Sequence, residues 1–314
     1  MRKRFVGILM TAFLAASVLA GCSSDAEKPG KGDPASDKYK VYLITMDQMD
    51  QHWVNVDAGA QKAVKELGNI EYKWLAPDVK DDAKQIEAIN NAVAGGADAI
   101  LLAANGPNAV KAALEEAKAE GVKIIYVDSA ADFPAIQTLA TDNKAAGKTA
   151  GDELIAALKA AGVVEGKIGI VTVNAATAST VAREEGFRSA FKGSKFEILE
   201  TQYGEGDAAK SKDIAANYIT QGVVGLFGAN EGSTVGVGNA IQEAGSKVIG
   251  VGFDKSDAIL QLIKNGHLLA TMAQNPDVMG YEGMKTAAKA LKGETISKTN
   301  IDTGVSVITK DKLK

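Results

Sequence analysis

The sequence has few of the residues on which metal and catalytic sites usually depend. It contains one cysteine and two histidines, and aromatic residues make up 5% of the chain. The patterns G-x-S-x-G, G-x-x-x-x-G-K-[ST] and H-E-x-x-H are absent, which argues against serine hydrolases, P-loop NTPases and zinc proteases. We therefore expect no enzyme activity, no metal and no cofactor.

The chain also lacks an excess of positive charge. Its net charge is −4 and its pI is about 5.4, so a nucleic-acid partner, which favours a basic face, is not expected. Hydrophobic residues at 46% and charged residues at 24% are ordinary for a soluble globular protein. The 314 residues suffice for two domains, each of roughly 130–150 residues with its own core.

Long apolar runs are missing except near the N-terminus. Met1–Phe5 is basic and Val6–Leu19 is apolar, but this run is too short and wrongly flanked for a membrane span. It ends in Leu19-Ala20-Gly21-Cys22, which resembles a bacterial lipoprotein signal. A lone cysteine is often a small buried side chain, but this position favours lipidation of Cys22. Residues 1–22 are thus the expected signal, and the Gly-, Pro- and Ser-rich residues 23–38 are the expected tether of an extracytoplasmic, lipid-anchored protein.

From residue 40 onward, short apolar runs alternate with helical patterns. The candidate strands are Val41–Thr45, Ile70–Trp74, Ala99–Leu102, Lys123–Val127, Lys167–Val173, Glu197–Tyr203, Val223–Gly228, Lys247–Phe253 and His267–Ala273. The glycines expected to end helices in a left-handed cap are Gly68, Gly95, Gly121, Gly162, Gly222, Gly245 and Gly266. This alternation predicts an α/β fold with two doubly wound parallel sheets. A TIM barrel, with eight units and closure, is the less favoured alternative.

Ligands of open parallel sheets bind beyond the carboxyl ends of the strands, and polar side chains gather at those positions. The segment "TMDQMDQHW" follows the first strand and holds several acceptors beside a tryptophan. Carboxylates, amides and a guanidinium bind hydroxyl groups, and an aromatic face packs on a sugar ring. The candidate ligand-binding residues are Asp50, His52, Trp53, Asn105, Asp128, Ser129, Asn174, Arg183, Asn230, Asp254 and Gln274.

Some of these residues have a purely structural alternative. Asp128 and Asp254 could cap the helices that follow them, although both come after wholly apolar strands in equivalent places of the two halves. Trp53 could be core or hinge packing, and His52 is a polar neighbour rather than a catalytic base. Arg183 lies near a helix start, where the helix dipole disfavours a cation, so another use is indicated.

In this order and spacing, several segments resemble the periplasmic sugar-binding proteins of ABC importers. This is the ribose/galactose-binding (type I) family, which shares its core with LacI-type repressors. The resemblance spans nearly all of residues 39–314. The segments are "WVNVDAGAQKAVKELG" (53–68), "ADAILLAANGPNAV" (97–110), "GVKIIYVDS" (121–129), "TDNKAAGKTAGDEL" (141–154), "REEGF" (183–187), "VGFD" (251–254) and "LLATMAQNPDVMGYEG" (268–283).

The resemblance implies two lobes that close about three hinge crossings on a ligand, without altering it chemically. The lobes would be residues 39–141 plus 275–302 and residues 142–274 plus 303–314. The crossings would lie near Thr141-Asp142, Gln274-Asn275 and Asp302-Thr303. The partners would be a small-molecule sugar or polyol and a membrane permease, and the protein would be a monomer.

Departures from the ribose binders of the family weaken the case for ribose itself. At the positions of Asp50, His52 and Ser129, these binders typically have Asn, Phe and Arg. They also have an aromatic residue near the position of Gly206. The expected cleft is acidic with Arg183 as its main counter-charge, which disfavours an anionic ligand and favours a neutral sugar or polyol, or one carrying an amine.

Other functions remain open. A ligand-sensing subunit for a receptor kinase would use the same site. A glycosidase would need two opposed carboxylates, which Asp128 and Asp254 superficially offer. A repressor with the same core is not expected, because it would need a basic helix-turn-helix where the predicted signal lies.

Overall fold

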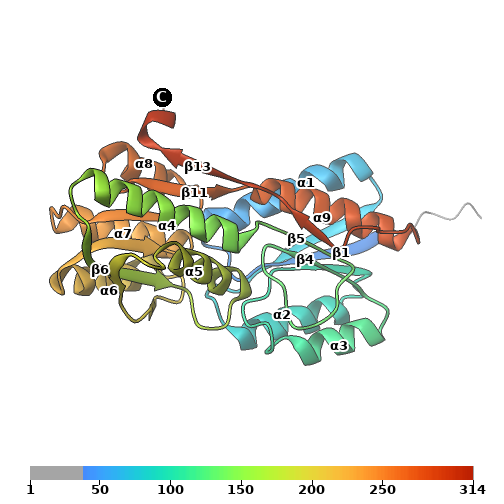
Figure 1. Ribbon diagram of the computed structural model, residues 1–314. Helices are drawn as coiled ribbons and strands as arrows, with labels where there is room; N and C mark the ends of the chain where they lie inside the picture. Colours follow the sequence, from blue (N-terminus) through green and yellow to red (C-terminus); the bar gives the residue numbers. More distant parts are fainter. Residues whose placement is uncertain (1–37, 314) are drawn as a thin grey trace, which may run out of the picture. The chain divides into compact units, whose positions relative to one another are not determined.

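The computed structural model describes residues 38–313, which form one compact unit. Two separate sheets are each covered by helices on both faces (Figure 1). This confirms the predicted α/β fold class with two doubly wound sheets. Cys22, the predicted signal and the tether, apart from Lys38, lie outside the described residues. Among the described residues, none of the helices has both the length and the apolar character needed to cross a bilayer.

The first sheet is wholly parallel and has the strand order β12-β5-β4-β3-β1-β2. Helices α1 and α9 pack on one face, and α2 and α3 pack on the other. We call this sheet and its helices the first lobe. Its strands are β1 (Tyr39–Ile44), β2 (Ile70–Leu75), β3 (Ala99–Leu102), β4 (Lys123–Val127), β5 (Gln137–Ala140) and β12 (Asn300–Asp302), and its helices are α1 (Gln51–Leu67), α2 (Asp82–Ala94), α3 (Lys111–Ala119) and α9 (Pro276–Leu291).

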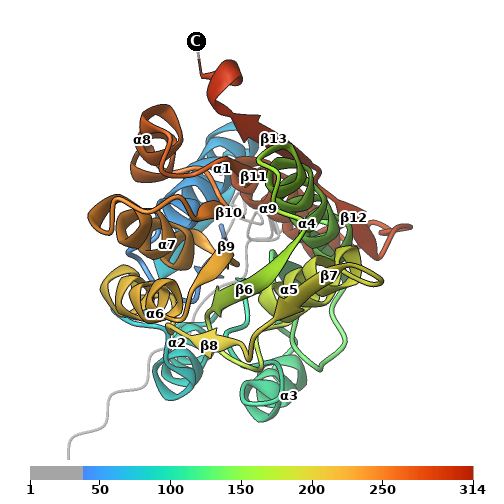
Figure 2. The ribbon, with the colours of Figure 1, turned by 60° about the vertical axis from the view of Figure 1, so that its left-hand side comes forward.

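The second sheet has the order β13-β11-β10-β9-β6-β7, and the short β8 pairs with β6. Only β13 is antiparallel. Helices α4 and α5 lie on one face and α6, α7 and α8 on the other (Figure 2). We call this the second lobe. Its strands are β6 (Glu165–Thr172), β7 (Lys195–Ile198), β8 (Gln202–Tyr203), β9 (Val223–Gly228), β10 (Ile249–Phe253), β11 (Ala270–Gln274) and β13 (Val305–Thr309), and its helices are α4 (Asn143–Ala160), α5 (Ala178–Ala190), α6 (Ala208–Thr220), α7 (Glu231–Glu243), α8 (Asp257–Asn265) and the short η1 (Lys310–Lys312).

Glycines allow the paired helices of each lobe to approach closely. A Cβ at Gly59 of α1 would lie 2.0 Å from the carbonyl oxygen of Asp277 in α9. The same holds in the second lobe, where a Cβ at Gly147 of α4 would lie 2.0 Å from the carbonyl oxygen of Arg183 in α5. No larger residue fits at these contacts without moving a backbone. Both pairs bring helix N-termini toward the sheet edge at which the strands end.

The chain passes between the sheets three times, and the crossing segments are bonded to one another. They lie between β5 and α4, between β11 and α9, and between β12 and β13. Thr141 Oγ1 donates to Gln274 Oε1 at 2.9 Å, and Asn275 Nδ2 donates to the carbonyl oxygen of Thr303 at 2.8 Å. Residues from all three crossings thus meet at one point between the lobes.

The structure corrects several sequence expectations. The strands β5, β12 and β13 were not predicted, and the single strand expected at Glu197–Tyr203 is two strands, β7 and β8. Gly95 is right-handed (φ −75°), and the left-handed conformation falls on Gly96 instead (φ +76°). The other predicted cap glycines do have positive φ.

Candidate functional site

A small cavity lies where the carboxyl ends of the strands of both sheets face each other. The loops after β1, β2 and β4 and the first turn of α1 form its wall in the first lobe. The ends of β6, β10 and β11 and the first turns of α5 and α7 form its wall in the second lobe. Its lining residues are Met46, Asp50, His52, Trp53, Lys80, Asp128, Val173, Thr177, Ser179, Thr180, Arg183, Asn230, Asp254 and Gln274.

Asp128 and Asp254 face this cavity from opposite lobes with the same unusual backbone. Their φ angles are +63° and +76°, in a left-handed region that costs a non-glycine residue free energy. Neither residue caps a helix: Ser256 caps α8, and the next strand after Asp128 is β5. The capping alternative is therefore wrong for both. Strained residues held in this way gather at functional sites.

His52 lies between these two carboxylates and is buried. Its Nε2 is 3.1 Å from Asp128 Oδ2, and its Nδ1 is 3.5 Å from Asp254 Oδ1. Burial opposes a charge on the imidazole, but the neighbouring Asp128 and the charge of Asp254 outweigh it and raise the pKa of His52 to about 9. The imidazolium therefore bridges the two lobes at neutral pH.

Lys80 is a second buried cation that the sequence analysis missed. It comes from the loop after β2, and its ammonium group forms ion pairs with Asp47 and, at 2.9 Å, with Asp50. Asp47 also accepts a hydrogen bond from Trp53 Nε1 at 3.1 Å. Burial raises the pKa of Asp50 to about 6, helped by Asp47 and opposed by Lys80. For Asp47, burial acts in the same direction, but Lys80 outweighs it and lowers the pKa.

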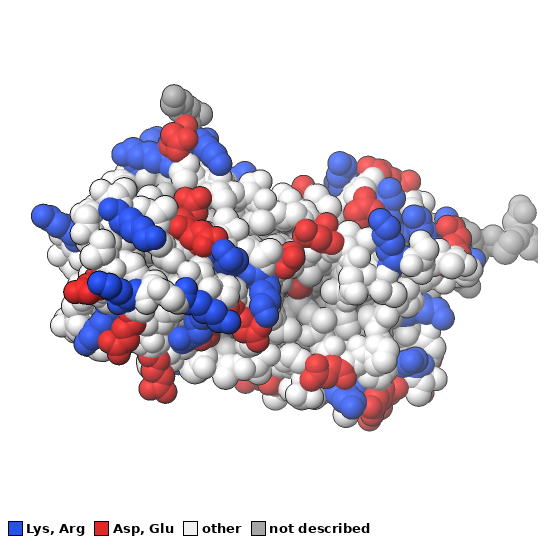
Figure 3. Space-filling model, viewed as in Figure 1, with Lys and Arg blue, Asp and Glu red and all other residues white. Residues whose placement is uncertain are grey.

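The idea that Arg183 is the main counter-charge of an acidic cleft is therefore wrong. Lys80, Arg183 and the imidazolium of His52 together oppose Asp47, Asp50, Asp128 and Asp254. These charges nearly cancel inside the cavity. On the face of the molecule in Figure 3, acidic and basic side chains are likewise interspersed.

Two donor nitrogens of the second wall, Arg183 Nη2 and Asn230 Nδ2, are buried without a hydrogen-bond partner among the described residues. Arg183 Nη2 approaches Asp128 Oδ2 only to 3.7 Å, and the other nitrogens of Arg183 donate to Asn143 and to the carbonyl of Ala229. Asp128 Oδ2 lies 3.1 Å from His52 Nε2 and, as a carboxylate oxygen, can accept a further bond. The two unpaired donors are costly to bury unless a ligand or water satisfies them.

Trp53 occupies a position between the cavity and the core. It lines the cavity and is also part of the buried cluster formed by β1, β3, β4, α1 and α9. Its ring meets the His52 ring edge-on, with centroids 4.6 Å apart. The indole therefore fixes the imidazole while it packs in the core.

Three predicted site residues lie behind the cavity wall and not on it. Asn105 donates to Asp82 at 2.5 Å, while its carbonyl accepts a bond from Thr177 across the lobes. Ser129 Oγ accepts a long 3.4 Å bond from the Ser179 amide, also across the lobes. Asn174 accepts bonds from Ala176 and Thr177 and shapes the loop before α5. The other predicted residues, Asp50, His52, Trp53, Asp128, Arg183, Asn230, Asp254 and Gln274, line the cavity.

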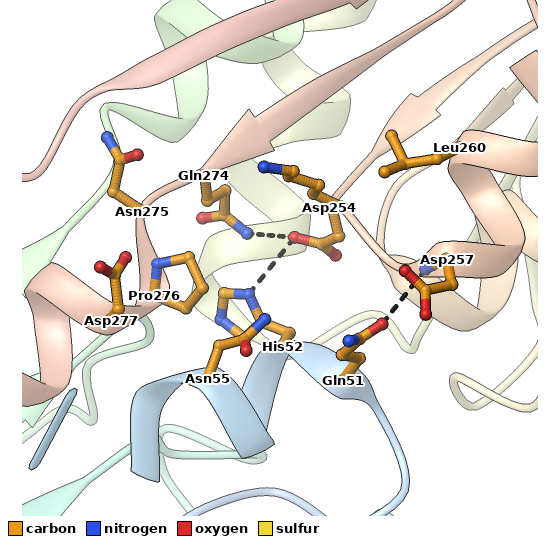
Figure 4. Close-up of a pocket in the computed structure, with 11 residues that line it drawn as sticks. Gln51, His52, Asn55, Asp254, Asp257, Leu260, Gln274, Asn275, Pro276 and Asp277 are labelled. Carbon is orange, nitrogen blue, oxygen red and sulfur yellow. Dashed lines mark hydrogen bonds and ion pairs between the residues drawn. The ribbon is translucent and has the colours of Figure 1, made fainter. Parts of the chain in front are cut away.

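An open groove of about 410 Å³ adjoins the cavity on the hinge side (Figure 4). It lies between the N-termini of α1 and α8 and the β11–α9 crossing, and His52, Asp254 and Gln274 line both spaces. Gln274 Nε2 donates to Asp254 Oδ1 at 2.5 Å, which ties the crossing to the second wall. Among the described residues, no cluster of His, Cys, Asp and Glu is suited to hold a metal ion.

Comparison with known proteins identifies the family. Residues 41–295 match the periplasmic binding protein domain. The chain belongs to this family. It is similar to the ribose import binding protein RbsB of Haemophilus influenzae, with 32% identity over 266 residues, covering 83% of this chain and 88% of that protein. RbsB of Escherichia coli is 31% identical over 266 residues, covering 82% of this chain and 87% of that protein.

Solved structures of sugar-binding family members share the fold. A carbohydrate transporter solute-binding protein from Agrobacterium radiobacter, in complex with D-arabinose, is 35% identical with a TM-score of 0.83 and covers 87% of this chain and 95% of its own. An ABC transporter solute-binding protein from Agrobacterium vitis with bound D-fucose is 32% identical with a TM-score of 0.82 and covers 87% of this chain and 96% of its own. This chain is thus a periplasmic sugar-binding protein of type I, whose relatives are binding proteins of transport systems.

Proposed function

We propose that this chain is the substrate-binding lipoprotein of an ABC importer and captures a neutral monosaccharide or polyol between its two lobes. The observation that carries the proposal is the convergence of two buried donors without a protein partner, Arg183 Nη2 and Asn230 Nδ2, on one cavity with the carboxylate of Asp128. Hydroxyl groups donate and accept at once, so a polyhydroxylated ligand suits this mixed set.

The charge balance favours a neutral ligand over an anionic one. The three cations of the site are already engaged by carboxylates, so an added anion would find no free positive charge. The relatives named for ribose and crystallised with D-arabinose or D-fucose bind neutral monosaccharides. Asp254 and Asp128 would accept from hydroxyls, Arg183 and Asn230 would donate, and Trp53 would supply an apolar wall. Lys80 lines the same cavity, and we include it among the proposed ligand-binding residues.

Capture requires the lobes to move. The cavity holds only about 20 Å³, about the room needed for one water molecule, so a sugar enters only when the lobes separate. We propose the bonded crossings near Thr141-Asp142, Gln274-Asn275 and Asp302-Thr303 as the hinge between lobes 39–141 plus 275–302 and 142–274 plus 303–314. Ligand then shifts the protein toward the closed form by its higher affinity for that form.

The mature protein would lie outside the cytoplasm, held at the membrane by lipid on Cys22 through the tether 23–38. The closed monomer would deliver its sugar to a membrane permease. Labelling growing cells with a clickable fatty acid tests the anchor, because Cys22→Ser should abolish incorporation.

Calorimetric titration tests the binding function. We expect at least one of D-ribose, D-arabinose, D-fucose, D-allose and myo-inositol to bind, and D-glucuronate not to bind. Asp254→Asn should abolish the heat, whereas Asp152→Asn, on the exposed face of α4, should not. Preferred binding of the anionic sugar, or an unchanged titration with Asp254→Asn, would contradict the proposal.

A further inference from the structure

The N-terminus of α1 in the first lobe is capped by a side chain of the second lobe. The N-cap residue Asp50 makes no side-chain cap bond. Instead Glu231, the first residue of α7, accepts from the backbone amides of Gln51 and His52, at 3.0 and 2.9 Å. Each carboxylate oxygen takes one amide, so the contact is bidentate. Free amides at a helix start favour a negatively charged acceptor.

A second contact runs in the opposite direction. The side chain of Gln51 extends from α1 to the second lobe, where its Oε1 accepts from the backbone amide of Asp257 at 3.1 Å (Figure 4). Asp257 is the first residue of α8. The backbone amide of Gln51 thus donates to Glu231 of the second lobe, while the side chain of Gln51 accepts from the first amide of α8 in that lobe.

We propose that Glu231 and Gln51 form a reciprocal clamp, in which each side chain caps the first turn of a helix in the opposite lobe and the pair holds the lobes closed. The clamp rests on the lobe closure proposed above. Opening would break all three bonds together and leave α1 without a cap for its first amides. The loss of a cap typically weakens a helix end about two- to thirtyfold.

The surroundings of Glu231 make the clamp sensitive to pH. Asp50 and His52 face it from the first lobe and Asp254 from the second, with Lys80 beyond Asp50. Burial raises the pKa of Glu231 to about 7, with Asp50 and Asp254 adding to the effect and the amides of His52 and Gln51 opposing it. An open cleft would return the carboxyl to water and to its ordinary value of 4.5.

The sign of the pH effect follows from this difference. Because the pKa is higher in the closed form, closure takes up a proton between about pH 4.5 and 7. The closed form is therefore fully favoured by this group at low pH and loses that advantage as the pH rises through about 7. The Glu231→Gln side chain cannot ionise but keeps one acceptor oxygen for the amides of α1, whereas Glu231→Ala removes both acceptor oxygens.

Small-angle X-ray scattering of the sugar-free protein, from about pH 5 to pH 9, tests the clamp. We expect the wild type to become less compact as the pH rises through about 7. Glu231→Gln should remove most of this pH-dependent opening, and Glu231→Ala should shift the equilibrium about two- to thirtyfold toward the open form below about pH 6, where the wild-type clamp is intact. Gln51→Ala should shift it in the same direction. Glu243→Gln is the matched control, because Glu243 ends the same helix α7 and pairs with Lys212 on the surface.

Two results overturn the clamp: a wild type that is open at every pH, or Glu231→Ala scattering that matches the wild type throughout. Parallel titrations with D-arabinose and D-ribose keep this outcome separate from the proposed function. If the protein binds sugar but the scattering of the Glu231 variants equals that of the wild type, the clamp is refuted and the proposed sugar-binding function is not. Opening by Glu231→Ala in a protein that binds no sugar refutes the sugar function and leaves the clamp standing.

Discussion

Asp128 and Asp254 occupy matching positions in the two lobes and hold one imidazole between them. Each follows a buried parallel strand and has a left-handed backbone, and each carboxylate contacts a different nitrogen of His52. Two like charges therefore face each other from opposite lobes and are separated by one cation. The contacts that join the two lobes here are therefore made by groups that also line the cavity.

The strained backbone at Asp254 predicts an unequal pair of variants. Both Asp254→Ala and Asp254→Gly should abolish the rise in melting temperature that a bound sugar gives the wild type. In the absence of sugar, the glycine variant should be the more stable of the two by about 1 kcal/mol, because glycine adopts positive φ without steric cost. Urea denaturation measures this difference. Equal stability of the two variants would show that the φ of +76° carries no strain.

Lys80 should be essential because two carboxylates depend on it. Lys80→Met leaves Asp47 and Asp50 buried without their cation, and we expect a loss of about 3–5 kcal/mol in the free energy of unfolding. Adding Asp47→Asn and Asp50→Asn to Lys80→Met should restore much of the lost free energy of unfolding, because the two buried carboxylates are then neutral. Lys84→Met is the control, since Lys84 pairs with Asp78 on the exposed surface and its loss should leave the free energy of unfolding nearly unchanged. Similar losses for the two lysine variants would refute the buried ion pairs.

His52 should give the sugar-free protein a pH-dependent stability. Its pKa is raised to about 9 from an ordinary value of 6.5, so its contribution is complete below about pH 6.5 and is lost as the pH rises through about 9. The total is on the order of 3 kcal/mol. Urea unfolding at about pH 6, 7.5 and 9.5 should show this decline, and His52→Gln should remove most of it. A variant with the wild-type decline would assign the effect to other groups.

The two roles of Trp53 should separate by substitution. Trp53→Ala empties part of the buried cluster and should cost about 3–5 kcal/mol of stability. Trp53→Phe keeps most of the volume but loses the 3.1 Å bond from Nε1 to Asp47, which is worth about 1 kcal/mol. In the phenylalanine variant we expect sugar affinity, measured by calorimetry, to fall about tenfold while the fold persists. Unchanged affinity in that variant would make Trp53 a core residue alone.

The sequence predicted the sheets well where strands are apolar and buried. Ala99–Leu102 is buried at every residue, and such a run can be recognised because both faces of the strand meet helices. By contrast β5 and β12 are short and mixed in polarity, so no periodicity marks them. Their pairing with each other joins segments about 160 residues apart, a relation that no local pattern contains.

The same reasoning explains which site residues were found. Asp128 and Asp254 follow apolar strands, so the rule for strand ends was enough to select them. Lys80 lies in the charged segment "DVKDD", which is typical of a solvated loop, and only the pairing of β2 beside β1 brings it to Asp47. Glu231 in a first helical turn is already explained by its own helix dipole. Its amide partners in the other lobe become visible only in three dimensions.

The helix α9 belongs to the first lobe although the whole of the second lobe except β13 and η1 precedes it in the chain. Met279, Met284 and Ala287 of this helix complete the core beneath α1. During synthesis, the second lobe can therefore assemble nearly all of its sheet while the earlier half of the polypeptide still has one face uncovered. A nascent chain halted before Pro276 would therefore leave the apolar surface that α9 covers exposed on its oldest part.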